Sequence, residues 1–355
     1  MSWDGADNVL AVRLDALGDV LMTTPALRAL RAGRAGRRLT LLTSPAGAEV
    51  AALIPEVDDV IVYDAPWVKA TAARADSAPD HAMLARLGGA GFDAAVIFTV
   101  YSQNPLPAAM LCCLADIPRR LAHCHENPYQ LLTDWVLDPE PARGVRHEVR
   151  RQLDLVAAIG CGSADERLSL WVPDAARDAT RRRLATLGLD RRRWVLIHPG
   201  ATAASRRYPP DRFAAAARGV AEATGGAIVV TGAAADAPAI EAVMRDLGGD
   251  AQAVTGLRLP EFAALVEAAP LLISNNSGPV HIAAAVGTPV VDLYALTNPQ
   301  HTPWAVPHRV LFHDVPCKYC YKSVCPEGHG NCLALVEPTR VVDAAVSLLT
   351  DVAAS

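Results

Sequence analysis

Aromatic side chains are scarce in this sequence, and neither sign of charge is in strong excess. Phe, Trp and Tyr make up 5% of the 355 residues, which argues against a surface built for base stacking or a long aromatic groove for a polysaccharide. The formal net charge of -5 provides no general attraction to nucleic acid or anionic lipid. We therefore expect no nucleic-acid partner, and any recognition of phosphate must be local.

Long apolar runs are also missing. No stretch reaches the roughly 18 to 20 uninterrupted apolar residues that a membrane-spanning helix requires. The first seven residues, MSWDGAD, lack a basic region, and the apolar run at 9–14 is short and contains Arg13. These features predict a cytoplasmic protein with at most peripheral contact at the inner face of a membrane.

Cysteine is scattered in the first half of the chain and clustered in the second. The scattered residues are Cys112, Cys113, Cys124 and Cys161, and the clustered ones are Cys317, Cys320, Cys325 and Cys332. In a reducing cytosol, scattered cysteines are usually buried thiols, whereas a tight cluster raises the question of a metal. The short spacings fit a tetrathiolate zinc or iron site as well as a loop of reduced thiols.

Short apolar runs alternate with helix-like stretches along the whole chain, which is typical of parallel sheets covered by helices. The predicted strands are 9–14, 39–43, 60–63, 94–98, 194–198, 227–231, 271–274 and 289–293. The predicted helices are 27–31, 81–87, 146–159, 212–223, 238–247, 260–269, 279–286 and 338–349. The length exceeds what one hydrophobic core usually serves. We therefore predict an α/β protein with two Rossmann-like, doubly wound domains at 1–165 and 175–335, and a C-terminal helix within 336–355 that packs on either.

The loop after the first predicted strand, 14–20, lies where open α/β sheets bind ligands. It contains Asp19, which can cap the next helix, and the local pattern favours that cap over a catalytic role. A GxGxxG fingerprint is absent, so an NAD-type site has little support.

Two loops of the second half combine small residues with phosphate-binding groups. The strand at 194–198 runs into His198-Pro199-Gly200-Ala201-Thr202, followed by Arg206 and Arg207, where backbone N–H groups and a guanidinium can meet a phosphate. An ordinary loop with solvated arginines explains that pattern equally well. The strand at 271–274 runs into Asn275 to Gly278, and Pro279 then stands where a helix begins, so the unpaired N–H groups of that helix start suit a diphosphate.

Two further side chains have both a functional and a structural interpretation. His281 lies on the first turn of the helix that Pro279 opens, but a lone histidine there is more often a core residue bonded to backbone. Asp236 follows the strand at 227–231, and its carboxylate can accept two ribose hydroxyls or cap the next helix. The convergence of three such loops, with groups suited to phosphate, ribose and base, predicts a nucleotide site in the second domain.

At these residues the chain resembles glycosyltransferase family nine, the heptosyltransferase family. The matching segments are Gly18-Asp19-Val20, Thr24-Pro25-Ala26-Leu27, His198-Pro199-Gly200-Ala201, Thr255-Gly256, 276–285, Gly287-Thr288-Pro289 and Thr297-Asn298-Pro299. The resemblance implies a GT-B fold, with an N-terminal acceptor domain and a C-terminal donor domain facing a cleft. It also implies inverting, metal-independent transfer from an ADP-sugar, typically ADP-heptose, to a glycan, lipid-linked or small-molecule acceptor.

The resemblance also implies roles for individual residues. Asp19 matches the family's general base, which reverses the local preference for a cap, and Gly18 lies beside it on the acceptor side. The donor-binding positions are Thr202, Arg206, Asp236, Asn276, Ser277, Gly278 and His281. Arg206 stands where some members have lysine and Asn276 where many have aspartate. Some members have a similar cysteine-rich loop, and certain protein-heptosylating relatives hold iron there, which adds a possible structural metal to the expectations.

Two other functions stay open at this stage. A GT-B nucleotide-sugar epimerase would convert the donor with no acceptor present, and a non-catalytic nucleotide-sugar sensor would bind it without releasing nucleotide. Acceptor selectivity is expected in loops of the first half, such as 101–105 and the arginine pair Arg119 and Arg120, although the sequence there has no diagnostic motif.

Overall fold

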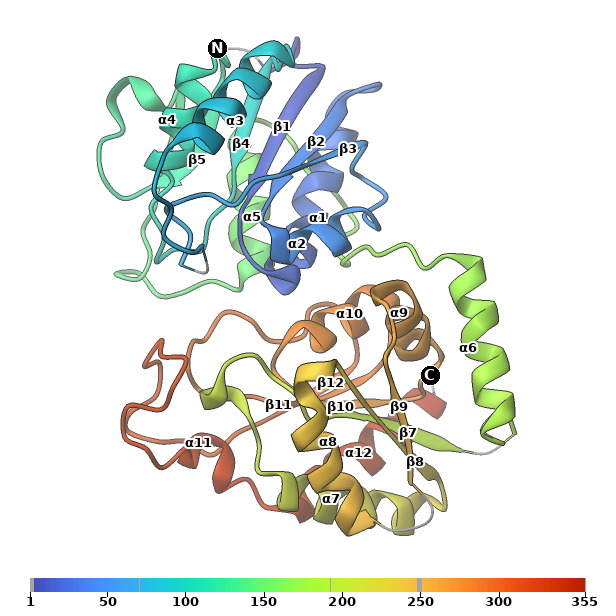
Figure 1. Cartoon of the computed structure of the whole chain (residues 1–355). Coiled ribbons are helices and arrows are strands. Elements are labelled where there is room, and N and C mark those ends of the chain that lie inside the picture. The colour runs from blue at the N-terminus through green and yellow to red at the C-terminus, as the bar shows by residue number, and fades with distance from the viewer. Residues whose placement is uncertain (1–2, 70, 192, 248–250, 355) are drawn as a thin grey trace. The chain divides into compact units, whose positions relative to one another are not determined.

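Two six-stranded parallel sheets form the framework of the computed structural model, which describes residues 3–69, 71–191, 193–247 and 251–354. The chain divides into two compact units, one ending at Trp171 and the other beginning at Val172. Each unit is an α/β layer structure with its own sheet and its own core (Figure 1). The predicted domain limits at residues 1 and 355 fall outside the described residues.

The first unit has the strand order β3-β2-β1-β4-β5-β6. Its strands are β1 (Asn8–Arg13), β2 (Arg38–Thr43), β3 (Asp59–Val62), β4 (Ala94–Ile97), β5 (Arg120–Cys124) and β6 (Asp134–Leu137). Its helices are α1 (Leu17–Ala32), α2 (Pro45–Ala51), α3 (Ala78–Gly89), α4 (Leu106–Leu114) and α5 (Glu148–Ala157), with a 3-10 turn η1 (Tyr129–Leu131). Helix α1 packs against α2 and α5, whereas α3 packs against α4. Central strands are continuously apolar because helices cover both faces of the sheet.

The second unit has the strand order β12-β11-β10-β7-β8-β9. Its strands are β7 (Trp194–His198), β8 (Ala227–Gly232), β9 (Ala251–Thr255), β10 (Leu272–Asn275), β11 (Val290–Leu293) and β12 (His308–Leu311). Its helices are α6 (Asp174–Thr186), α7 (Pro210–Thr224), α8 (Ala237–Leu247), α9 (Leu259–Ala268), α10 (Gly278–Val286), α11 (Asn331–Ala334) and α12 (Pro338–Ala353), with 3-10 turns η2 (Ala204–Arg206) and η3 (Ala234–Asp236).

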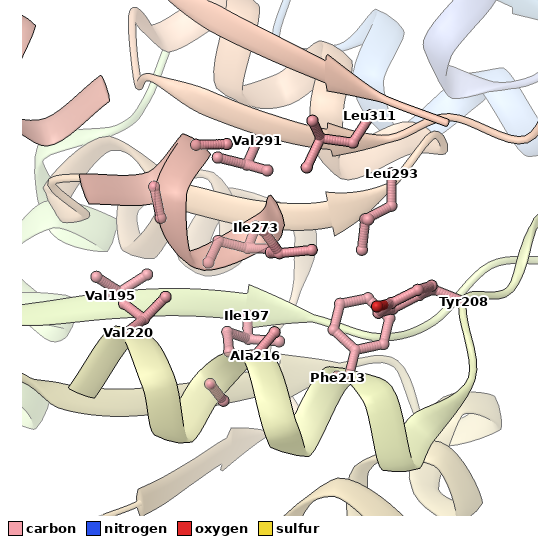
Figure 2. Close-up of a cluster of buried hydrophobic side chains, with 14 of the residues drawn as sticks. Val195, Ile197, Tyr208, Phe213, Ala216, Val220, Ile273, Val291, Leu293 and Leu311 are labelled. Atoms are coloured by element: carbon pink, nitrogen blue, oxygen red, sulfur yellow. The ribbon is translucent and has the colours of Figure 1, made fainter. Parts of the chain in front are cut away.

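The core of the second unit joins its sheet to α7. Ile197 of β7 and Ile273 of β10 are 1% and 0% exposed, and they belong to one core cluster with Phe213 and Val220 of α7 (Figure 2). Full burial of one such side chain contributes about 1.5–3 kcal/mol. This packing fixes the position of β7, and with it the loop that follows β7 at the carboxyl edge of the sheet.

The last helix also belongs to the second unit, because α12 packs on α7. A side-chain carbon added at Gly219 of α7 would come within 2.6 Å of a methyl group of Val342 in α12, so glycine permits the close approach of the two helices. Tyr208 completes the junction, since its hydroxyl donates to the carbonyl of Val336 at 2.7 Å.

Each sheet has one place where the chain reverses its direction of winding. In the first unit the reversal lies between β1 and β4, where Val12 pairs with Ile97. In the second unit it lies between β7 and β10, where His198 pairs with Ser274. Ligands of open α/β sheets bind outside the carboxyl ends of the strands at such a switch point. The fold therefore marks two places, one in each unit, where side-chain chemistry matters most.

None of the helices among the described residues combines the length and apolarity needed to cross a bilayer.

Candidate functional site

A single buried guanidinium organises the switch point of the first unit. Arg13, the last residue of β1, is 0% exposed and forms ion pairs with three carboxylates. Its Nε lies 3.0 Å from Asp15 Oδ2, its Nη2 lies 3.2 Å from Asp19 Oδ1, and its Nη1 lies 2.9 Å from Glu148 Oε1. One positive charge thus holds three acidic groups that would otherwise repel one another.

Asp19 is the carboxylate in this cluster that solvent reaches most easily. Its side chain is 21% exposed, compared with 14% for Asp15 and 1% for Glu148. The N-cap of α1 is Ala16, which makes no side-chain cap bond, so the local interpretation of Asp19 as the cap residue is wrong. Asp19 lies in the first turn, next to the half-buried Gly18, and is held by Arg13.

Glu148 is a member of the cluster that sequence reasoning missed. Burial raises the pKa of its carboxyl to about 7, the charge of Arg13 opposes that rise, and the charge of Asp19 adds to it. Gln152 donates to Glu148 Oε1 at 2.6 Å. Glu148 and Asp19 both pair with the guanidinium of Arg13. With a pKa of about 7, the carboxyl of Glu148 changes its charge within the physiological pH range.

A cavity of about 390 Å³ lies beside this cluster, within the first unit. It is lined by Asp15, Trp67, Lys69, Gln103, Asn104 and residues at the ends of β1 and β4. Gln103 Nε2 donates to Asp15 Oδ1 at 2.5 Å, which links the cavity wall to the carboxylate cluster. Residues 102–104 of the loop where acceptor selectivity was expected therefore line a cavity next to Asp15, which shares its ion-pair partner Arg13 with Asp19.

Arg120, one of the two arginines named as candidates for acceptor selectivity, has a structural role. Arg120 is 9% exposed, and its side chain donates to the carbonyls of Leu131, Ile117 and Gln130. Arg119 donates to the carbonyl of Asp93 at 3.2 Å. The guanidinium of Arg120 thus satisfies backbone oxygens that would otherwise be buried without donors.

In the second unit, the amide of Asn275 joins the two loops at the switch point. It is 0% exposed, its Nδ2 donates to the carbonyl of Pro199 at 2.7 Å, and its Oδ1 accepts from the N–H of Tyr208 at 2.9 Å. The β7 loop, the start of α7 and the end of β10 are thereby tied to one side chain. Sequence reasoning included Asn275 in the loop but did not single it out.

The predicted phosphate-binding residues of the β7 loop differ in their surroundings. Thr202 is exposed and Arg206, the last residue of η2, is partly buried. Arg207 donates from Nε to the carbonyl of Ala201 at 2.8 Å, so its guanidinium is used within the loop. Of the two arginines, Arg206 has the charge that reaches the buried carboxyl of Asp292.

Asp236 has a local backbone role, and its carboxylate also faces the loop after β7. It ends η3, and its Oδ2 accepts from the N–H of Ala233 at 3.0 Å, which is a local backbone role. The same carboxylate faces Gly200: a side-chain carbon there would come within 2.2 Å of Asp236 Cγ. His198 lies 3.8 Å away, and burial lowers its pKa, an effect that the charge of Asp236 opposes. Gly200 thus leaves the room that the carboxylate occupies.

Helix α10 begins at the carboxyl end of β10 as predicted. Ser277 is its N-cap residue, Gly278 its first residue, and Pro279 stands at the start of the first turn. Ser277 makes no side-chain cap bond, and its Oγ instead donates to the carbonyl of Asn275 at 3.3 Å. The N–H groups of this helix start are therefore not taken by a capping side chain, which suits an anion. His281 is 4% exposed, which agrees with a histidine packed in the core.

Asn276 is held by two acceptors, one of which is a residue that sequence reasoning missed. Its Nδ2 donates to Asp292 Oδ2 at 2.9 Å and to the carbonyl of His301 at 2.8 Å. Asp292 lies in β11, one strand away from β10, and is 0% exposed. The only signal in the sequence is one acidic residue inside an apolar run, VVDLY, which is an unusual place for a charge.

The cysteine loop, 315–332, has free thiols and no disulfide among the described residues. Cys317 Sγ lies 3.9 Å from His329 Nε2, and the N–H of Gly330 donates to Cys325 Sγ at 3.4 Å, which lowers the pKa of Cys325. Within the described part of the chain, no three His, Cys, Asp or Glu side chains are grouped so that they could hold a metal ion. As arranged, the four thiols do not fit the tetrathiolate site, although their donor chemistry would suit zinc or iron.

This loop nevertheless contacts the turn η2. Ser205 in η2 donates from its backbone N–H to the carbonyl of Ser323 at 3.0 Å and from its Oγ to the carbonyl of Lys322 at 2.7 Å. The conformation of the cysteine loop therefore helps to fix Ser205, the residue next to Arg206.

The chain is similar to heptosyltransferases in sequence. A family model described as "Glycosyltransferase family 9 (heptosyltransferase)" matches residues 81–330. "Lipopolysaccharide heptosyltransferase 3" of Escherichia coli (strain K12) is 29% identical over 163 residues, 44% of this chain and 46% of that relative. The aligned part thus spans about half of that relative's length.

Solved structures show the same fold. A glycosyl transferase family 9 structure from Veillonella parvula DSM 2008 has a TM-score of 0.80 and 22% identity, with 99% of each chain covered. The E. coli ADP-heptose lps heptosyltransferase II has a TM-score of 0.74 and 22% identity, covering 97% of this chain and 99% of that one. They confirm the predicted GT-B fold with two Rossmann-like sheets. Since the family model covers more than half of the sequence, this chain belongs to glycosyltransferase family 9, the heptosyltransferase family.

Proposed function

We propose that the chain transfers a heptose from ADP-heptose to a hydroxyl group of a glycan, lipid-linked or small-molecule acceptor. The observation that carries the proposal is the convergence of the β7, β8 and β10 loops at one edge of the second sheet, in a member of this family. That edge combines a guanidinium, a carboxylate and an uncapped helix start, which are groups suited to diphosphate and ribose. The names of the similar proteins support heptose and ADP as parts of the donor.

The first unit supplies the proton acceptor in this proposal. Asp19 takes the proton of the acceptor hydroxyl while that oxygen forms a bond to the anomeric carbon and the bond to the diphosphate breaks. A single displacement of this kind inverts the configuration at the anomeric carbon. The ion pair with Arg13, whose Nη2 lies 3.2 Å from Asp19 Oδ1, holds this carboxylate in place. The 390 Å³ cavity next to Asp15 is the proposed place for the acceptor.

The second unit binds the donor and stabilises the leaving ADP. Negative charge grows on the diphosphate as the sugar leaves, and the N–H groups at Ser277 and Gly278 together with Arg206 are the groups that meet it. Thr202 adds a hydroxyl donor, and Asp236 accepts from the ribose. We propose that these donors and the one guanidinium stabilise the leaving diphosphate without a metal ion, so that the transfer is metal-independent.

Replacing Asp19 tests the proposed base. We expect Asp19→Asn to lower kcat by about 10²- to 10⁴-fold, the usual contribution of a general base, while ADP binding stays unchanged. Glu49→Gln, a carboxylate-to-amide change at an exposed position of α2, is the matched control and keeps full activity. Unchanged turnover in Asp19→Asn would remove the assigned base.

An assay with labelled donor distinguishes the transferase from the epimerase and from the non-catalytic binding protein. ADP-heptose carrying an isotope label is incubated with the protein alone and then with candidate acceptors. Conversion of the sugar without any acceptor identifies an epimerase. Tight binding with no release of ADP under any acceptor condition identifies a non-catalytic binding protein. Release of ADP that depends on an acceptor supports the transferase.

For the cysteine loop we propose a structural role, in which a zinc or iron ion would draw the four thiols together and hold the loop against Ser205. Metal analysis of protein purified without added ions tests this. About one equivalent per chain supports the ion, and a value near zero removes it.

A further inference from the structure

Asp292 is a buried carboxyl in a place where an apolar side chain would be easier to accommodate. It is 0% exposed within β11, and its neighbours Val291 and Leu293 are equally buried. Its Oδ2 accepts from Asn276, whereas Oδ1 has no hydrogen-bond partner within the described part of the chain. Burial raises the pKa of Asp292 to about 8, although the hydrogen bond from Asn276 and the charge of Arg206 oppose the rise. Such a costly residue is expected where function requires it.

The contacts of Asn276 show what Asp292 achieves. The amide nitrogen of Asn276 has two N–H groups, and here they meet two acceptors, Asp292 Oδ2 and the carbonyl of His301. The carbonyl oxygen of His301 can only accept a hydrogen bond, so the nitrogen of the Asn276 amide must be the atom that faces it. The backbone N–H of Asn276 also donates to the carbonyl of Leu293 at 3.1 Å, which fixes the main chain. The oxygen side of the amide is therefore the side left for a ligand.

An amide oxygen selects its ligand by chemistry. It repels the oxygens of a phosphate and accepts a hydrogen bond from a hydroxyl. Asn276 directly precedes Ser277 and the start of α10, where the diphosphate is proposed to bind. In a nucleotide-diphosphate sugar, the transferred sugar is bonded directly to the diphosphate, so its hydroxyl groups lie close to the phosphates.

We propose that Asp292 is a positioning residue that fixes the amide of Asn276 so that Asn276 Oδ1 accepts a hydrogen bond from a hydroxyl of the transferred sugar. This inference rests on the proposed function. Asp292 acts only through Asn276, so it contributes to binding of the sugar part of the donor and not to binding of ADP. Either protonation state of Asp292 has an oxygen that accepts from Asn276, so the proposal needs the acceptor atom and not the charge.

The test compares ADP and ADP-heptose as ligands in calorimetric titrations of the whole chain. Asp292→Leu removes the acceptor, and we expect a loss of about 3- to 10-fold in affinity for ADP-heptose, the equivalent of one net hydrogen bond, with ADP affinity changed less than about twofold. Asp292→Asn keeps an oxygen acceptor at the same place and restores the preference for ADP-heptose. Thermal unfolding in the same samples checks that the variants are folded.

Asn276→Ala completes the cycle. We expect it to lose as much ADP-heptose affinity as Asp292→Leu, and the double variant to lose no more than Asn276→Ala, because both residues act on one hydrogen bond. Equal losses for ADP and ADP-heptose, additive losses in the double variant, or no loss at all would each overturn the inference. If the wild-type protein binds neither ligand, the proposed function fails instead.

A variant that keeps the size of residue 276 serves if Asp292→Leu does not fold. In Asn276→Asp the new carboxylate faces two acceptors, the Asp292 carboxyl and the His301 carbonyl, and we expect a selective loss of ADP-heptose affinity. Adding Asp292→Asn supplies an N–H donor and recovers part of that loss. Recovery supports the positioning role, and its absence contradicts it.

Discussion

The two units of this chain have the same sheet topology, but the side chains at their switch points differ in chemistry. One sheet is ordered β3-β2-β1-β4-β5-β6, and the other, written from its other edge, β9-β8-β7-β10-β11-β12. At the first switch point, Arg13 binds three carboxylates. At the second, the amides of Asn275 and Asn276 hold the loops, and the helix start of α10 has no side-chain cap.

The difference shows which part of a site the fold decides and which part the side chains decide. Strand order decides where the ligand-binding edge lies, in both units alike. The side chains at that edge then decide the chemistry: a cluster of acids around one guanidinium suits proton transfer, whereas N–H groups and a single arginine suit an anion. The comparison predicts that changes in the second unit alter donor binding and that changes in the first alter proton transfer.

The largest test of this division is Arg206→Ala. We expect kcat/KM to fall about 10²- to 10³-fold and ADP binding to weaken with it, because a cation next to the diphosphate is lost. Arg206→Lys keeps the charge without the forked geometry and should retain part of the activity. Arg218→Ala, an exposed arginine of α7, is the control and stays active. Unimpaired ADP binding in Arg206→Ala would break the assignment of donor binding to the second unit.

A second test uses pH and Glu148. Because burial raises the pKa of Glu148 to about 7, the folded chain keeps a proton that the unfolded chain loses at about pH 4.5. The wild type should therefore lose stability relative to Glu148→Gln as pH rises from about 4.5 to 7, and the difference should stay constant above that range. Urea unfolding of both variants at several pH values measures it, and ADP binding should not change. A stability difference that grows with rising pH in favour of the wild type would contradict the sign.

A smaller effect is expected from Gly200→Ala. The added carbon would come within 2.2 Å of Asp236 Cγ, so the carboxylate must move. We expect ADP affinity to fall about 3- to 10-fold, as for the loss of one hydrogen bond. Gly162→Ala, where nothing lies within 4 Å of the added carbon, is the control in the first unit and should leave ADP affinity unchanged. The same affinity in wild type and Gly200→Ala would show that Asp236 does not contact the nucleotide.

The smallest expected effect is that of Ser205→Ala. It removes one hydrogen bond to the cysteine loop, at a cost of about 0.5–1.5 kcal/mol, and leaves the backbone bond to Ser323 in place. We expect ADP affinity to fall by less than about fivefold. Ser347→Ala in α12 is the control. A drop as large as that of Arg206→Ala would mean that the loop has a direct part in donor binding.

The central strands could be predicted from the sequence because they are continuous apolar runs, as in β1 and β8. The edge strand β3 could be predicted as well, whereas β5, β6, β9 and β12 could not. Strand β5 contains Arg120 and His123, both buried, and the Arg120 guanidinium and His123 Nε2 pair with carbonyls that only the folded chain brings near. Strands β6, β9 and β12 are short and partly exposed at or near the sheet edges, so their apolar signal is weak.

Helix α6 was missed for a related reason. Its sequence, DAARDATRRRLAT, is polar on most of its surface, and the buried face consists of Ala176, Thr180 and Leu184 alone. An ion pair of Arg177 with Glu267 in α9, with Nε 2.7 Å from Oε2, joins it to its neighbour. Helix α1 was predicted only in its second half, because Pro25 lies inside it and argues against a helix there.

Within the candidate site, short motifs were visible in the sequence and long-range partners were not. Residues 276–281 and 198–202 follow strands directly, so their position at the sheet edge could be predicted. Glu148 lies far along the chain from Arg13, and Asp292 reaches Asn276 only because β10 and β11 are neighbours. No local pattern indicates such pairs.

The contact between α7 and α12 has a consequence for the order in which the chain acquires its structure during synthesis. All residues of the first unit precede Val172, so that unit can complete its core while the rest is still being translated. The core of the second unit includes Val341, Ala345 and Leu348 from the last helix. The proposed donor half can therefore close only after nearly the whole chain has left the ribosome, and until then the apolar face of α7 needs protection from aggregation.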